Sequence, residues 1–176
     1  MSMPAQHDAS KVFQHLADQT SGPILDVFGP TVEFLTQSDE FCVLRGVVPP
    51  GVTVPLHRHG DTEDFFIISG TQQVLVHGKA GLEWRDAHAG DYVCIPGDVP
   101  HAIRNVTEEP AVALIITTAR MGRFFQEVGR PITSTPAPPT PEELAHFVNV
   151  AETYGYILGS AEENATVGII IPGFAP

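Results

Sequence analysis

The stretch that decides the fold is residues 51–70, which read GVTVPLHRHGDTEDFFIISG. His57 and His59 are two residues apart, and on a β-strand such residues point to the same face. The polar turn formers at 60–62 reverse the chain, so that Glu63 begins the next strand beside them. Two imidazoles and one carboxylate are therefore predicted to meet on one side of a β-fold.

A second stretch, residues 96–101, reads PGDVPH and brings one more histidine from a separate strand. Three imidazoles and one carboxylate suit a divalent transition metal and leave room for a substrate. These ligand types do not choose among Fe, Mn, Ni, Co, Cu and Zn. The predicted metal ligands are His57, His59, Glu63 and His101.

Between residues 22 and 118, short runs of Val, Ile, Thr and aromatic residues alternate with Gly, Pro and Asp. Many short strands separated by turn signals predict a sandwich or a barrel, and so an all-β fold class. We expect strands at 24–28, 31–37, 41–48, 53–57, 64–69, 71–77, 81–87, 91–95, 101–106 and 111–118.

Short helices are predicted on both sides of this region. Residues 11–16 could form one, and residues 122–131 another, with Gly129 at its end. Thr140 and Glu143 make a capping box that predicts a third helix, from 141 to about 154. We divide the chain into an N-terminal extension (1–22), a barrel with its following helix (23–130), and a C-terminal linker, capped helix and apolar tail that pack on the barrel (131–176).

Composition narrows the classes of function. The chain has 176 residues, 9 Lys and Arg, and 21 Asp and Glu, for a formal net charge of −12. This acidity argues against nucleic acid or an anionic membrane surface as a partner. No signal-peptide pattern and no run of 18 apolar residues occurs, so a cytoplasmic protein is expected. Cys42 and Cys94 lie in apolar runs and are predicted to be buried, reduced thiols.

The glycines and prolines around the ligands complete two motifs. Gly51, five residues, His57-x-His59, three residues, Glu63, six residues and Gly70 resemble the first motif of the cupin family. Gly90, five residues and Pro96, then His101, three residues and Asn105, resemble the second. The resemblance implies an antiparallel jelly-roll β-barrel, a metal on the four ligands and, frequently, a homodimer.

One position departs from the family pattern. Asp98 stands where cupins usually have glycine. Because Asp tolerates left-handed geometry better than most residues, we expect an altered turn and an intact site.

Alternation also predicts the walls of the site. If Glu63 points inward, Phe65 and Ile67 point the same way, and Ile103 does so beside His101. These apolar side chains suit an aromatic or otherwise apolar small-molecule substrate.

The three-histidine, one-glutamate site resembles that of the quercetinase group of flavonol dioxygenases. The first hypothesis is therefore a metal-dependent dioxygenase acting on an aromatic or enolisable compound, with Glu63 as both ligand and catalytic base. The second is an isomerase, decarboxylase or lyase that uses the metal as a Lewis acid. The third is a non-enzymatic cupin that binds a small molecule. A thiol dioxygenase fits less well. Resemblance to that group would imply a site of three histidines without a carboxylate, whereas this sequence has Glu63.

Overall fold

The structure is a computed structural model that describes residues 24–79, 81–132 and 138–171. The predicted helix at 11–16 and the extension at 1–22 lie outside the described residues, as does the end of the apolar tail. None of the helices in the described part is long and apolar enough to cross a membrane.

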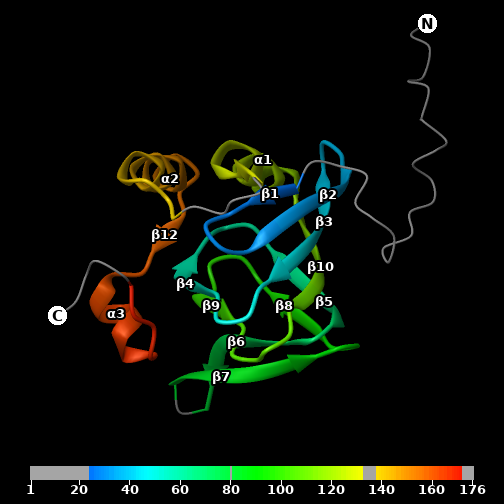
Figure 1. Cartoon of the computed structure of the whole chain (residues 1–176), viewed down its shortest axis with the longest axis vertical. Helices are drawn as coiled ribbons and strands as arrows, with labels where there is room; N and C mark the ends of the chain where they lie inside the picture. The colour runs from blue at the N-terminus through cyan, green and yellow to red at the C-terminus, as the bar shows by residue number, and fades with distance from the viewer. Residues whose placement is uncertain (1–23, 80, 133–137, 172–176) are drawn as a thin grey trace, which may run out of the picture.

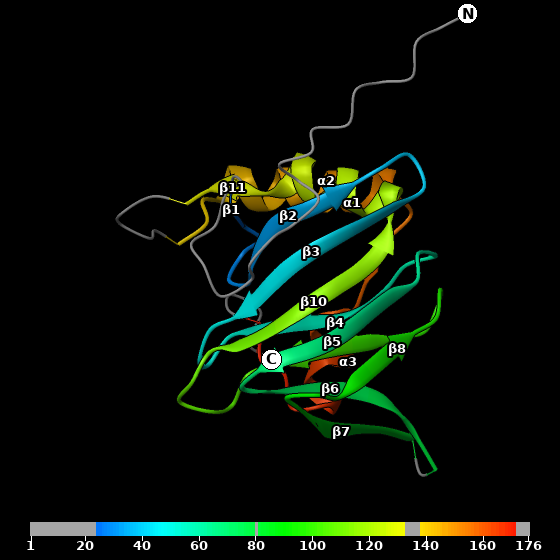
Figure 2. The same ribbon diagram turned by 90° about the vertical axis from the view of Figure 1, so that its right-hand side faces the viewer.

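Two antiparallel sheets pack face to face (Figures 1 and 2). One has seven strands in the order β11-β1-β2-β3-β10-β5-β8, and the other has five in the order β12-β4-β9-β6-β7. The predicted all-β jelly-roll fold is confirmed, with one refinement. The two sheets keep free edges at β8 and β7, and they do not close into a continuous barrel.

The bounds of the strands are β1 (Ile24–Asp26), β2 (Thr31–Gln37), β3 (Phe41–Val48), β4 (Thr53–Arg58), β5 (Glu63–Ser69), β6 (Thr71–Gly78), β7 (Gly81–His88), β8 (Tyr92–Ile95), β9 (His101–Arg104), β10 (Ala111–Thr118), β11 (Arg130–Pro131) and β12 (Ile157–Leu158). Every strand predicted from the sequence is present within a few residues. β11 and β12 were not predicted, because two residues are too short to show a period.

The main core lies between the two sheets and follows from alternation along the strands. In β3 every second residue is buried, including Cys42 and Leu44, and β10 shows the same pattern. The five-stranded sheet contributes Val74 and Ile103 to the same cluster. Cys94 corrects our prediction, since it is exposed. Side chains alternate along the short edge strand β8. Cys94 points outward, and the next residue, Ile95, is buried.

Three helices follow the last long strand: α1 (Ala119–Val128), α2 (Pro141–Thr153) and α3 (Ala161–Thr166). Gly129 caps the C-terminus of α1, and Thr140 caps the N-terminus of α2 with the predicted capping box. α1 and α2 lie side by side near β1 and β2 (Figure 2) and share a second apolar cluster. α3 was not predicted, although Ser160 and Glu163 form a capping box that announces it.

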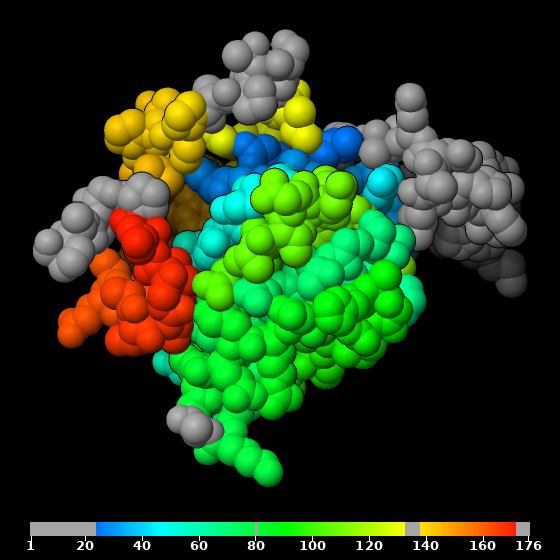
Figure 3. Space-filling model, turned by 60° about the horizontal axis from the view of Figure 1, so that its bottom comes forward, coloured from blue at the N-terminus to red at the C-terminus, as the bar shows by residue number. Residues whose placement is uncertain are grey.

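The described part of the C-terminal segment returns to the five-stranded sheet. Ile169 packs against Leu75 and Ala102 on the side of this sheet turned away from the main core. Asn164 is fully buried, and its side-chain oxygen accepts a hydrogen bond from the Leu56 amide in β4 (2.8 Å). Figure 3 shows this segment, in orange and red, against the body of the molecule.

Candidate metal centre

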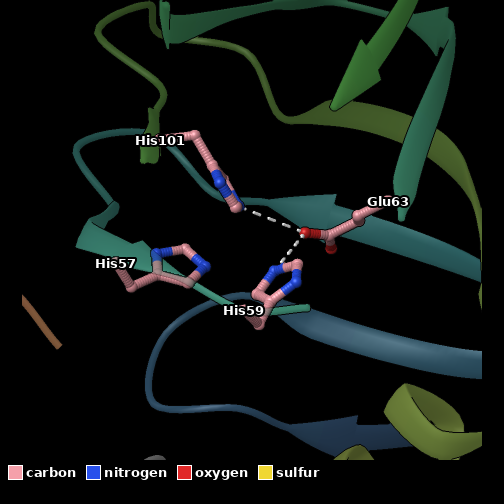
Figure 4. A group of neighbouring side chains, drawn as sticks. All are labelled: His57, His59, Glu63 and His101. Carbon is pink, nitrogen blue, oxygen red and sulfur yellow. Dashed lines mark ion pairs between the residues drawn. The ribbon is translucent and has the colours of Figure 1, made fainter. Parts of the chain in front are cut away.

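The four predicted ligands come together where the two sheets meet (Figure 4). His57 lies in β4 and His101 begins β9, and these two residues are direct partners in the five-stranded sheet. Glu63 begins β5 in the seven-stranded sheet. His59 lies on the link between β4 and β5 that passes from one sheet to the other. The cluster therefore forms only when both sheets are in place.

The ligand atoms converge closely. One ring nitrogen from each histidine and one oxygen of Glu63 all lie within 4.8 Å of one another. Nε2 of His59 and Nε2 of His101 are each 3.4 Å from the same carboxylate oxygen, Glu63 Oε2. A metal bound at about 2.1 Å spaces its ligands by roughly 3 to 4 Å, so the cluster is close to the size that coordination requires.

The backbone sets the orientation of all three rings. Nδ1 of His57 lies 2.8 Å from the carbonyl oxygen of Pro55, and Nδ1 of His101 lies 2.8 Å from that of Val99. Nδ1 of His59 is 2.9 Å from the carbonyl oxygen of Asp61. A carbonyl only accepts, so each Nδ1 carries the proton and donates it. The lone pair of each neutral ring is then on Nε2, as in metal-binding histidines.

Two of these Nε2 atoms are buried without a hydrogen-bond partner, on His59 and His101. Their lone pairs face a carboxylate oxygen at 3.4 Å, which is repulsive unless positive charge lies between them. Protons or a metal ion can supply that charge. The donor set therefore fits a divalent transition metal.

The electrostatics of the cluster agree with a site that holds positive charge. Burial alone raises the pKa of Glu63, but the imidazoles of His101 and His59 outweigh it and leave that pKa well below its usual range. Burial works to lower the pKa of His59, yet the Glu63 carboxylate outweighs it and raises that pKa. Burial and the neighbouring His101 lower the pKa of His57 to about 3. Glu63 is therefore ionised and His57 neutral near pH 7.

The turn before His101 supports the link that carries His59. The amide of Asp98 donates to the carbonyl oxygen of His59 (2.6 Å). A Cβ on Gly97 would lie 2.4 Å from the carbonyl oxygen of Gly60, so glycine permits this close approach. Asp98 adopts a φ of 65°, the left-handed conformation expected where cupins usually have glycine. Asp98 thus takes the left-handed position itself, and the ligand cluster is assembled.

Sequence reasoning missed a buried carboxylate next to the ligands. Asp61 is 5% exposed and accepts hydrogen bonds from the Thr118 hydroxyl, the Arg120 guanidinium and the Tyr156 hydroxyl. Burial and the charge of Asp61 raise the pKa of Tyr156 well above its usual range, so this hydroxyl remains a donor. The local sequence around Asp61 indicates only a turn. Its partners lie 57 to 95 residues away, where no spacing rule reaches.

The predicted wall residues all point inward and belong to the main core. Phe65, Ile67 and Ile103 are 3%, 0% and 5% exposed. Their contact with a substrate stays a prediction. Among the described residues, the remaining histidines are exposed and lie outside the cluster: His77, His88 and His146.

The fold agrees with comparisons to known proteins. The family model of the cupin domain matches residues 44–117. A solved RmlC-like cupin from Shewanella frigidimarina superposes with a TM-score of 0.50 at 18% identity, over 61% of this chain and 92% of that one. Residues 44–117 therefore match the cupin domain, and the fold of the molecule is that of a solved cupin.

One curated relative is similar to part of this chain. The dimethylsulfoniopropionate lyase DddQ of Ruegeria pomeroyi is 32% identical over 79 residues, which are 45% of this chain and 37% of that protein. The solved structure of that lyase aligns with a TM-score of 0.41 at 31% identity, over 46% of this chain and 39% of that one. The matched region spans well under two thirds of this relative's length.

Proposed function

We propose that this protein is a metal-dependent lyase in which His57, His59, Glu63 and His101 hold one divalent transition metal. The observation that carries the metal is the pair of buried, unpartnered Nε2 atoms that face the Glu63 carboxylate. The identity of 32% to a dimethylsulfoniopropionate lyase supports elimination over the dioxygenase that we first considered.

The proposed substrate class is a small carboxylate with a leaving group on its β-carbon, of the dimethylsulfoniopropionate type. A bound divalent metal acts as a Lewis acid toward the substrate carboxylate and so makes the neighbouring C–H more acidic. A base takes the α-proton, the C–S bond breaks with its electron pair leaving on sulfur, and an unsaturated acid and a neutral thioether result. No oxidant is consumed.

Glu63 is the proposed base. Its pKa lies below the usual range, so it is a carboxylate at neutral pH and can accept a proton as well as ligate the metal. A weak base of this kind suffices only where the C–H bond is already acidified. Burial of Glu63, His59 and His101 keeps bulk water from competing for the proton and strengthens local electrostatics.

The test compares two reactions on one preparation. Protein loaded in turn with Fe, Mn, Ni, Co, Cu or Zn is incubated without oxygen with dimethylsulfoniopropionate, and thioether and acrylate are measured. Oxygen uptake is measured separately with flavonols, catechols and β-diketones. We expect elimination without oxygen uptake, a loss of at least about 100-fold in Glu63→Gln, and unchanged rates in His88→Ala, which alters an exposed histidine.

Two results would contradict the proposal. Oxygen consumption with a flavonol and no elimination would restore the dioxygenase. Ligand binding without turnover over all six metals would favour a binding cupin.

A further inference from the structure

We infer that Asp61 is a positioning residue through which the C-terminal segment controls the geometry of the metal site. This inference rests on the metal site of the proposed function. It concerns residues 154–159, which lie outside the segment that the cupin family model matches.

The backbone of Asp61 orients the ring of His59. The Asp61 carbonyl oxygen accepts the Nδ1–H of His59 at 2.9 Å, so the position of the Asp61 backbone sets the direction in which Nε2 points. Partners of this kind behind a ligating histidine orient the ring and fix its tautomer. Asp61 lies in the short link between β4 and β5. The backbone of this link is also held on either side of Asp61, by the Asp98 amide on the His59 carbonyl oxygen and by the Thr117 hydroxyl on the Thr62 carbonyl oxygen, each at 2.6 Å.

Hydrogen bonds to the Asp61 carboxylate hold this link against the rest of the molecule. The Asp61 carboxylate is buried, and its three side-chain donors come from distant parts of the chain. Thr118 precedes α1, Arg120 lies in α1 and donates to Oδ2 at 2.6 Å, and Tyr156 follows α2 and donates to Oδ2 at 3.1 Å. A buried carboxylate that loses such donors is strongly destabilised. These three contacts therefore hold the Asp61 side chain, and with it this part of the link, against α1 and Tyr156.

Tyr156 also contacts a predicted metal ligand directly. Its ring lies against the His59 ring, with centroids 5.0 Å apart and planes tilted by 38°. Tyr156 is 6% exposed and packs on Phe124 of α1, at a centroid distance of 4.4 Å. It thus touches one ligand ring directly and holds the same ligand through Asp61.

β12 follows Tyr156 immediately and pairs with β4, the strand that carries His57. Ile157 and Leu158 pair with Arg58 and His57, and the Gly159 amide donates to the Leu56 carbonyl oxygen at 2.7 Å. One short C-terminal segment therefore supports the backbone of His57 and, through Tyr156 and Asp61, the ring of His59. Two of the four ligands depend on it.

The test uses the full-length protein loaded with Co²⁺, whose visible absorption reports ligand geometry. Two variants change the contact: Asp61→Asn, which removes the charge, and Tyr156→Phe, which removes only one hydroxyl. The matched control is Tyr154→Phe, because the Tyr154 hydroxyl donates to the exposed Glu127 and not to Asp61. For each protein the Co²⁺ spectrum, the Co²⁺ dissociation constant from chelator competition, and the circular dichroism of the metal-free protein are measured.

We expect Asp61→Asn to weaken Co²⁺ binding by about 10- to 100-fold and Tyr156→Phe by about 3- to 10-fold. Both variants should shift the Co²⁺ spectrum while the fold is retained, and Tyr154→Phe should match the wild type. The double variant should lose less than the product of the single losses, because both act through one contact. If Asp61→Asn fails to fold, Tyr156→Phe alone decides.

An unchanged spectrum and affinity in a folded Tyr156→Phe would overturn the inference and leave the metal site standing. A wild-type protein that takes up no Co²⁺ or any other divalent metal would remove the metal site, and both proposals with it. Co²⁺ binding with the expected spectral shifts, in a protein without lyase activity, would support the positioning role and contradict only the reaction.

Discussion

The two ends of β9 carry two buried polar clusters that differ in one respect. At its start, His101 joins His59 and Glu63, and Nε2 of each histidine has no hydrogen-bond partner. Just past its end, Asn105 is 0% exposed, and its side-chain amide is fully used. Nδ2 donates to the carbonyl oxygens of Val48 (2.9 Å) and Glu109 (2.7 Å), while Oδ1 accepts from the amide and hydroxyl of Thr107.

The difference separates a cluster that completes the fold from one that needs a ligand. A buried polar group without a partner costs free energy, and groups that only serve folding are therefore satisfied within the protein. Asn105 meets that condition and the histidine cluster does not. The two ends of one strand should accordingly respond to mutation in opposite ways.

The largest expected effect is on metal binding in His101→Ala. This change removes one of four ligands, so metal affinity should fall by more than about 100-fold, since even supporting partners of a ligand are worth 10- to 100-fold. The fold should remain, because His101 lies outside the main apolar core that holds the two sheets together. Elemental analysis after growth in defined metal, with circular dichroism, measures both.

His88→Ala is the matched control, because His88 is exposed and its ring makes a surface contact with the Thr71 hydroxyl. Full metal occupancy in His101→Ala would remove His101 from the ligand set and make the two ends of β9 alike.

Asn105→Ala should do the reverse. It leaves buried carbonyl oxygens and the Thr107 amide without partners, so the free energy of unfolding should fall by roughly 2–4 kcal/mol. Metal content per folded molecule should not change. Urea unfolding of the metal-free protein gives the first quantity, and elemental analysis of the folded fraction gives the second.

The control for this variant is Asn149→Ala, an exposed asparagine in α2. A lowered metal content in folded Asn105→Ala would show that the two clusters are coupled along β9.

The smallest expected effect is on the pH dependence of stability, through His57 of the histidine cluster. The pKa of His57 is lowered to about 3, whereas an unfolded chain has its ordinary value near 6.5. Between these values the unfolded chain binds a proton that the folded chain does not, so the stability of the metal-free protein falls as pH falls from about 6.5 toward 3. His57→Gln should reduce the slope of the unfolding free energy against pH. The reduction corresponds to at most about one bound proton.

Urea midpoints of both metal-free proteins at pH 4.5 and pH 7 test this expectation. Between pH 7.5 and 8.5 the difference between them should be constant, because His57 is neutral in both states there. An equal fall below pH 6.5 would mean that His57 is not held neutral by its surroundings.

Local patterns carried most of the fold prediction. Alternation in β3 and β10, the turn residues between strands and the capping box at Thr140 are short-range signals, and each produced the expected element. The ligand cluster was also predictable from the sequence, although His59 lies just past the end of β4 and not on the same strand as His57. The first choice of reaction is less well supported than its alternative. Metal ligands define what a site can hold, and they say little about the bond that breaks.

The chain's sequence by itself determined the strands, the ligand types and their order, since these depend on neighbours a few residues apart. Tertiary structure alone decided that two sheets supply the ligands, that β12 pairs with β4 beside His57, and that Asp61 meets Tyr156. Those contacts join residues as far as 95 positions apart. Their energy comes from desolvation and packing in the assembled fold, which no local pattern encodes.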